Sequence, residues 1–226
     1  MNKKNGKMTT KFKQEKQKRE TMIKKSLRVL LLASISSLLF IGCSNHEAAL
    51  KTIPNEVTQA NECISNNKEF EADCYDLISY KNSIAMLRSG VIAYSNGKYE
   101  EAFQKYSLAQ KKGNFYANSL LADLYNKGNG VPKNQEKALD LLKDVEDVDG
   151  IAAYKLSFYY MNKKDYDEVI ELLTFAANKN VKKAQYELSK IYRDGIITKD
   201  NPEKAKFWYE QYENKSNSLL RKIYGI

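Results

Sequence analysis

Four segments of this chain repeat one order of residue types every 32 to 35 residues, and this repetition limits the fold more than any other feature. The clearest pair is YANSLLADLYNKGNGVPKNQEKALDLL at residues 116–142 and KAQYELSKIYRDGIITKDNPEKAKFWY at residues 183–209. Both read Ala, Leu and a small residue, Tyr, Gly, a turn, and then Glu-Lys-Ala. With two weaker copies included, the small residues recur at Gly90, Ala122, Ser157 and Ser189.

A period in the low thirties with two helices in each unit is typical of tetratricopeptide-type arrays. Units one and three have the plain tetratricopeptide length, whereas units two and four carry a turn that is four residues longer. The longer form resembles Sel-one-like repeats. This resemblance covers residues 81–212 and implies an all-α fold, a right-handed α-solenoid of four helix-turn-helix repeats in which tetratricopeptide-like and Sel-one-like units alternate.

Segments on either side of the array are expected to cap it. Residues 56–80 predict one or two N-terminal capping helices, and residues 213–226 predict a C-terminal capping helix over the last hydrophobic face. Inside each unit, the small residue of the first helix lets the second helix approach to about 8 Å. Gly97, Gly128 and Gly195 stand where a left-handed residue ends a helix, and Pro202 suits the first turn of the next one.

Residues 1–42 have the character of an export leader. They hold 11 of the 37 Lys and Arg but only two of the 28 acids, so the formal net charge of +9 belongs to them and the remainder is neutral. A basic segment after Met22 precedes an apolar run over residues 29–41, which is too short to span a bilayer. We therefore expect a signal peptide with an upstream extension, and Met22 as the natural start.

The end of the apolar run, Phe40-Ile41-Gly42-Cys43, resembles the lipobox of bacterial lipoproteins. The resemblance implies that Cys43 is lipidated, with acyl chains that hold the protein at the membrane. Ser44 then implies the outer membrane, with the protein facing the periplasm, and residues 43–55 are expected to be the lipidated cysteine and a tether. Ordinary signal cleavage beside a free cysteine is the alternative.

Export allows the remaining cysteines, Cys63 and Cys74, to form a disulfide. Their separation suits two antiparallel helices joined near Asn66 and Asn67, and closing such a loop contributes about 3 kcal/mol. Two buried thiols are the alternative.

Little in the chain predicts catalysis. The single histidine, His46, falls in the expected tether, which argues against a histidine-dependent triad and against a metal site. We expect no enzyme activity, no cofactor, no metal and no small-molecule substrate. The neutral charge after the leader, together with export, argues against nucleic-acid binding.

What remains is a binding surface. The resemblance implies that first-helix residues line the inner face of the solenoid, and an aromatic and apolar strip continued by two cations is the best candidate for binding a peptide or protein. Burial of this strip by curvature or by the capping helices is the alternative. The candidate residues are Tyr94, Tyr154, Phe158, Met161, Tyr186, Lys190 and Arg193.

Three functions are open at this point. The first is a non-enzymatic lipoprotein adaptor of the cell envelope, because related lipoproteins assist assembly, secretion or export machinery. The second is a β-lactam-binding or hydrolysing protein, suggested by cysteine-rich Sel-one-like relatives, although the chain has no Ser-x-x-Lys arrangement in a cleft. The third is a secreted factor that acts on host cells or competing bacteria.

Overall fold

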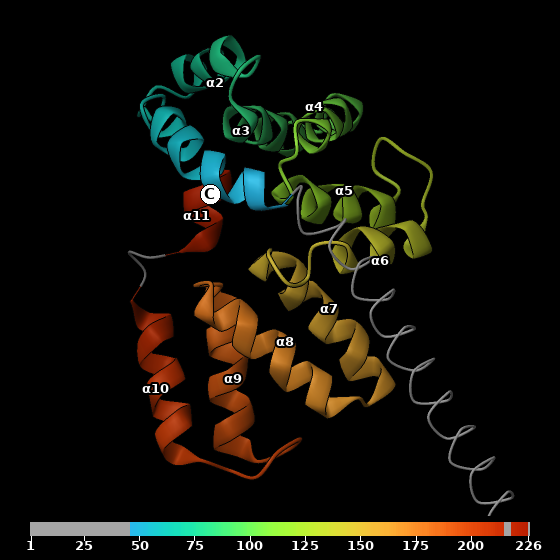
Figure 1. The fold of residues 1–226 in the computed structure, drawn as a ribbon, viewed down its shortest axis with the longest axis vertical. Helices are drawn as coiled ribbons and strands as arrows, with labels where there is room; N and C mark the ends of the chain where they lie inside the picture. The colour runs from blue at the N-terminus through green and yellow to red at the C-terminus, as the bar shows by residue number, and fades with distance from the viewer. Residues whose placement is uncertain (1–45, 215–217, 226) are drawn as a thin grey trace, which may run out of the picture. The chain divides into compact units, whose positions relative to one another are not determined.

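The computed structural model describes residues 46–214 and 218–225, and within them every regular element is a helix (Figure 1). The leader and Cys43 lie outside the described residues. A helix over residues 46–61 comes first. The others are α2 (Lys68–Ile78), α3 (Ser83–Ser95), α4 (Tyr99–Lys111), α5 (Tyr116–Lys127), α6 (Gln135–Lys143), α7 (Gly150–Lys163), α8 (Tyr166–Asn178), α9 (Lys182–Asp194), α10 (Pro202–Glu213) and α11 (Leu219–Tyr224).

The helices pack in consecutive pairs. Helix α3 lies on α4, α5 on α6, α7 on α8 and α9 on α10, while contacts of α4 with α5, α6 with α7 and α8 with α9 join each pair to the next. One continuous core of buried apolar side chains runs through the pairs. The predicted α-solenoid of four helix-turn-helix repeats is confirmed.

The small residue of each unit is buried, and Gly90 lies in the contact between paired helices, as predicted. A Cβ atom placed on Gly90 would lie 2.5 Å from a ring carbon of Tyr106 on α4, which shows how closely α3 and α4 approach. The corresponding Ala122, Ser157 and Ser189 are all buried. Each serine donates its hydroxyl to a carbonyl oxygen of its own helix, three residues earlier, so its burial leaves no polar group unsatisfied.

The two long turns adopt one geometry. Gly128 and Gly195 end α5 and α9 with φ values of 78° and 61°, the left-handed region that favours glycine. The backbone N–H of Asn134 then donates to the carbonyl oxygen of Tyr125, and that of Asn201 donates to Tyr192, at 2.8 and 2.7 Å. Both asparagines also accept a backbone N–H bond as helix N-caps. Equivalent sequences therefore make equivalent turns.

The expected tether is wrong for residues 46–55, because the first helix already begins at His46. It carries a stripe of buried apolar side chains at helical spacing, which explains why this segment folds. The His46 ring lies edge-on to Phe115, with ring centroids 5.8 Å apart, so the histidine belongs to the folded domain. The stripe consists of Ala49, Ile53, Val57 and Ala60.

The C-terminal helix α11 does not lie over the face where we expected it. It packs against α3 of the first unit, with Leu219, Ile223 and Tyr224 buried (Figure 1). Helix α10 consequently keeps an open face. On that helix Tyr209 is exposed, whereas its neighbour Trp208 is buried.

Candidate protein-binding surface

The aromatic part of the predicted strip is present on α7. The rings of Tyr154 and Phe158 meet edge to face with centroids 5.0 Å apart, because positions four residues apart are neighbours on a helix. Tyr154 and Met161 are half-buried against the core, whereas Phe158 keeps 46% of its surface exposed. Phe158 is therefore the large apolar side chain of α7 that is available to a partner.

The strip continues on α9, but its cations are paired. Tyr186 is exposed and contacts the Tyr212 ring of α10 at 5.1 Å. Lys190 lies over the Tyr186 ring and forms an ion pair with Glu187 at 2.8 Å. Arg193 binds both carboxylate oxygens of its neighbour Asp194. The predicted positive end of the strip is thus close to neutral.

Tyr94 stands apart from the other candidates. It belongs to α3, and its hydroxyl accepts hydrogen bonds from Lys127 at 2.9 Å and from Asn129 at 3.3 Å. The Tyr94 ring also packs against Tyr99, with centroids 5.2 Å apart. These contacts link the first two units, so we assign Tyr94 a structural role and remove it from the binding surface.

A cleft of about 640 Å³ opens beside Phe158, between the second and third units. This cleft is not predicted from the first helices alone, because α6 supplies part of its wall. Leu139 and Leu142 of α6 give an apolar lining, and Asp123 and Asn126 of α5 give a polar one. An apolar cleft with a few polar groups is the usual form of a site that accepts a side chain or small group.

Lys155 orients the polar side of this cleft. Its ammonium group donates to Asp123 Oδ2 at 2.8 Å and to the carbonyl oxygen of Ser119 at 2.7 Å. Because Asp123 and Lys155 come from the second and third units, the pair fixes the two walls against each other. The ion pair also neutralises the charges of Asp123 and Lys155.

A buried carboxylate supports α7 beneath the cleft. Asp149 accepts hydrogen bonds from the Ser119 hydroxyl and, at 2.8 Å, from the backbone N–H of Ile151, so it caps α7 and ties it to α5. Complete burial raises the pKa of Asp149 to about 6, and the hydrogen bond from Ser119 offsets this only in part.

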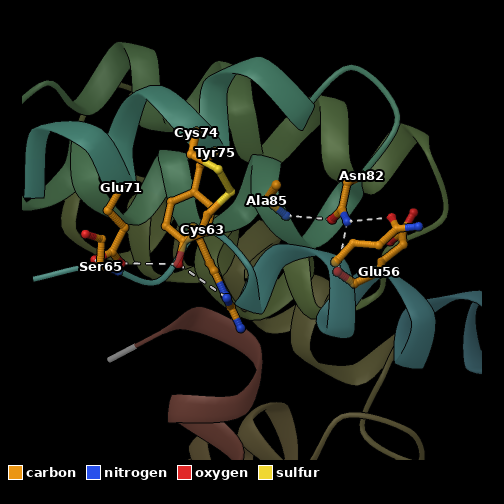
Figure 2. Close-up of a disulfide and its surroundings, with 10 residues drawn as sticks. Glu56, Cys63, Ser65, Glu71, Cys74, Tyr75, Asn82 and Ala85 are labelled. Atoms are coloured by element: carbon orange, nitrogen blue, oxygen red, sulfur yellow. Dashed lines mark hydrogen bonds between the residues drawn. A yellow bond between two sulfur atoms is a disulfide. The ribbon is translucent and has the colours of Figure 1, made fainter. Parts of the chain in front are cut away.

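Far from the cleft, the first helix and α2 meet at the two cysteines. The Cα atoms of Cys63 and Cys74 are 5.5 Å apart and their sulfur atoms are joined (Figure 2). Asn67 caps α2 by accepting backbone N–H bonds from Glu69 and Phe70, which places the turn where we expected it. Formation of this disulfide in the exported protein stays a prediction.

Within residues 46–214 and 218–225, no three His, Cys, Asp or Glu side chains gather in a way that would hold a metal ion. The helices of the same segments include none that is long and apolar enough to cross a bilayer.

Comparison with curated proteins gives remote similarity. The chain is 24% identical over 160 residues to an "Exopolysaccharide production negative regulator" of Rhizobium meliloti (strain 1021), covering 62% of this chain and 60% of that protein. A protein of the same name from Rhizobium leguminosarum bv. viciae gives 24% identity over 159 residues. The chain thus spans about 60% of the length of these relatives.

Solved structures share the fold. A Sel1 repeat protein from Oxalobacter formigenes matches with a TM-score of 0.64 at 24% identity, covering 77% of this chain and 76% of that one. A protective antigen of uropathogenic Escherichia coli strains, described as displaying an SLR fold, matches with a TM-score of 0.53 at 23% identity over 76% of this chain and 40% of that one.

The Sel1 repeat model itself matches residues 115–143 and 182–211. These segments contain α5 with α6 and α9 with α10, the two units with the longer turn. These two units are Sel1-like helical repeats, and the likeness to the solved structures shows that the chain shares the fold of Sel1 repeat proteins.

Proposed function

We propose that this protein is a non-enzymatic adaptor of the bacterial cell envelope, held by a lipid on Cys43 at the outer membrane and binding a protein partner at Phe158 and the neighbouring cleft. Sel1 repeats generally mediate interactions between proteins, and their fold is typically a non-catalytic scaffold. The proposal adds three points to this general role: the lipid anchor, the periplasmic location and the binding residues.

One observation carries the binding surface: Phe158 is 46% exposed at the rim of the cleft between the second and third units. A large side chain that a partner covers contributes about 1.5 to 3 kcal/mol, and aromatic anchors beside pockets dominate many interfaces. The Asp123–Lys155 pair fixes the cleft walls in advance, so little ordering is required when a partner binds.

The envelope location is supported by the sequence and by the relatives. The leader ends at Gly42-Cys43, as in lipoprotein precursors. Two relatives carry a name that refers to exopolysaccharide production, and export machinery is among the envelope partners that the resemblance implies. An envelope protein of such a machine is therefore the partner class to seek first.

The binding surface is tested by placing a photo-crosslinking amino acid at position 158 in the native envelope. We expect a discrete protein adduct there, and its loss when Leu139→Glu and Leu142→Glu line the cleft with charge. Position 207 is the matched control, because Phe207 is 50% exposed but lies on α10, away from the cleft. An equal adduct at both positions, or none at position 158, would refute the proposed surface.

The anchor has its own test. Metabolic labelling with a palmitate analogue should mark the wild-type protein and leave Cys43→Ala unlabelled. Labelling that survives this substitution would show that Cys43 is not the lipid site.

A further inference from the structure

Two contacts join the C-terminal half of helix α4 to α2 and to the turn that follows α2, on one side of the first unit. The ammonium group of Lys105 lies 2.7 Å from Asp76, and that of Lys112 donates to the carbonyl oxygen of Tyr80 at 2.8 Å. Residues 105 and 112 are two turns apart on the same face of α4, so Leu108 lies between them, facing the end of α2.

Three large apolar side chains are exposed at this junction. Leu77 has 75% of its surface exposed, Tyr80 65% and Leu108 50%. Scattered exposed apolar residues are ordinary on protein surfaces, but neighbouring ones mark a contact site. All three keep half or more of their surface exposed in the described part of the chain.

The lysines around these side chains are not neutralised. Lys81 lies over the Tyr80 ring at 5.2 Å, Lys112 binds a carbonyl oxygen, and neither these two nor Lys111 forms an ion pair with a described carboxylate. Two nearby acids, Asp76 and Glu101, are engaged by Lys105, whereas Glu62 lines one cleft with Tyr80 and Lys81. We call this surface the α2–α4 patch; its members are Leu77, Tyr80, Lys81, Leu108, Lys111 and Lys112.

We propose that the α2–α4 patch binds the anionic surface of a phospholipid bilayer. Unpaired ammonium groups are attracted by lipid phosphates, leucine side chains enter the boundary of the acyl chains, and a tyrosine suits the interface because its ring is apolar and its hydroxyl polar. The carboxylate of Asp73, one turn before Leu77, marks the edge of the patch on the α2 side. A lipid on Cys43 would bring the α2–α4 patch to the membrane. The patch should bind a bilayer even in protein that lacks this anchor.

Residues 44–226 without the lipid test this directly, since the described core lies within them. Co-sedimentation with vesicles of phosphatidylethanolamine and phosphatidylglycerol should retain the protein, vesicles of phosphatidylcholine alone should not, and added salt should weaken the binding. Each lysine near an anionic surface favours binding by about fivefold, so the three substitutions should lower the partition coefficient by more than tenfold. The substitutions are Lys81→Gln, Lys111→Gln and Lys112→Gln.

A matched variant removes the same charge elsewhere and should bind nearly as wild type: Lys133→Gln, Lys183→Gln and Lys199→Gln. The apolar contribution is separated by Leu77→Ser with Leu108→Ser, compared with Ile196→Ser and Phe207→Ser on exposed positions of the last unit. Circular dichroism of each variant verifies the helical fold.

Absence of binding to phosphatidylglycerol vesicles would overturn the proposal, as would equal losses in the two lysine variants, which would indicate general charge attraction. A protein adduct in place of a lipid adduct from a photo-crosslinker at position 108 would assign the patch to a protein and overturn it too. The crosslink at position 158 is measured independently, so the two proposals fail separately.

Discussion

Arg88 on α3 donates a hydrogen bond from Nη2 to the carbonyl oxygen of Lys222 at 2.9 Å, across 134 residues of chain. Its Nε donates to the carbonyl oxygen of Ile223 at 3.3 Å, and the side chain is 1% exposed. The last carbonyl groups of a helix lack partners within that helix and carry partial negative charge. A buried guanidinium thus completes the C-terminal end of α11 and holds it on the first unit.

Arg88→Met should lower the free energy of unfolding by about 2 to 3 kcal/mol, since it leaves buried carbonyl groups without donors. Hydrogen exchange should increase first in α11. Arg193→Met is the control, because Arg193 is exposed and only pairs with its neighbour, and it should change stability by less than about 0.5 kcal/mol. Equal effects of the two substitutions in urea unfolding would contradict this role of Arg88.

Gly90→Leu should destabilise the protein by about 1 to 3 kcal/mol, because the added side chain meets the Tyr106 ring in the contact between α3 and α4. Thermal unfolding measures the loss. Ser95→Leu adds the same side chain at an exposed position of the same helix and should be nearly neutral. If Gly90→Leu is tolerated as well as Ser95→Leu, the close approach of these helices is not what selects the small residue.

Asp149→Asn should change how stability depends on pH. Burial raises the pKa of Asp149 from 3.8 to about 6, so between these values the folded chain binds more protons than the unfolded one. The stability due to the protonated carboxyl is therefore present below pH 4 and lost as the pH rises through 6, at about 1.4 kcal/mol for each pH unit.

Asparagine keeps both contacts of this position, since its oxygen accepts the Ile151 N–H and its amide group donates to Ser119. Denaturant unfolding from pH 4 to 7 should show the free energy of unfolding of the variant rising relative to that of the wild type by about 2 to 3 kcal/mol. Above pH 6 the difference should become constant. The exposed Asp147→Asn is the control. A difference between variant and wild type that stays constant with pH would rule out this titration.

Joining Cys63 to Cys74 should stabilise the oxidised protein by about 3 kcal/mol, the contribution of a short closed loop. Reductant should lower the unfolding midpoint of the wild type and leave Cys63→Ser with Cys74→Ser unchanged. Intact mass should show two fewer hydrogens in the oxidised wild type. Free thiols in protein isolated from the envelope would show that the pair is not bonded.

The repeats were predictable because each unit is decided by nearby residues. The spacing of Gly90, Ala122, Ser157 and Ser189 gave the helix pairs, and the Gly128 and Gly195 turns followed from local conformation. The stripe from Ala49 to Ala60 has the spacing of a buried helix face, whereas the lipobox resemblance favours a tether for the same residues.

Other features had no local signal. The docking of α11 depends on contacts between Arg88 and residues 134 and 135 positions away, which no periodicity encodes. Within the candidate surface, the exposure of Phe158 was predictable from its helix position. The cleft was not, because it requires the relative placement of α6 and α7, and neither was the pairing of Lys190 and Arg193 with adjacent acids.

The early start of the first helix limits how far the folded domain could lie from a lipid on Cys43. Only two residues separate Cys43 from His46, and a residue spans at most about 3.6 Å, so the Cα atoms of Cys43 and His46 lie at most about 11 Å apart and a lipid on Cys43 would hold the first helical turn close to the bilayer. So short a connection to the lipid would confine the domain to a thin layer at the bilayer. It would also raise the effective concentration of the domain for binding to membrane-bound neighbours. Partners resident in the opposite membrane would have to extend across the periplasm to meet it.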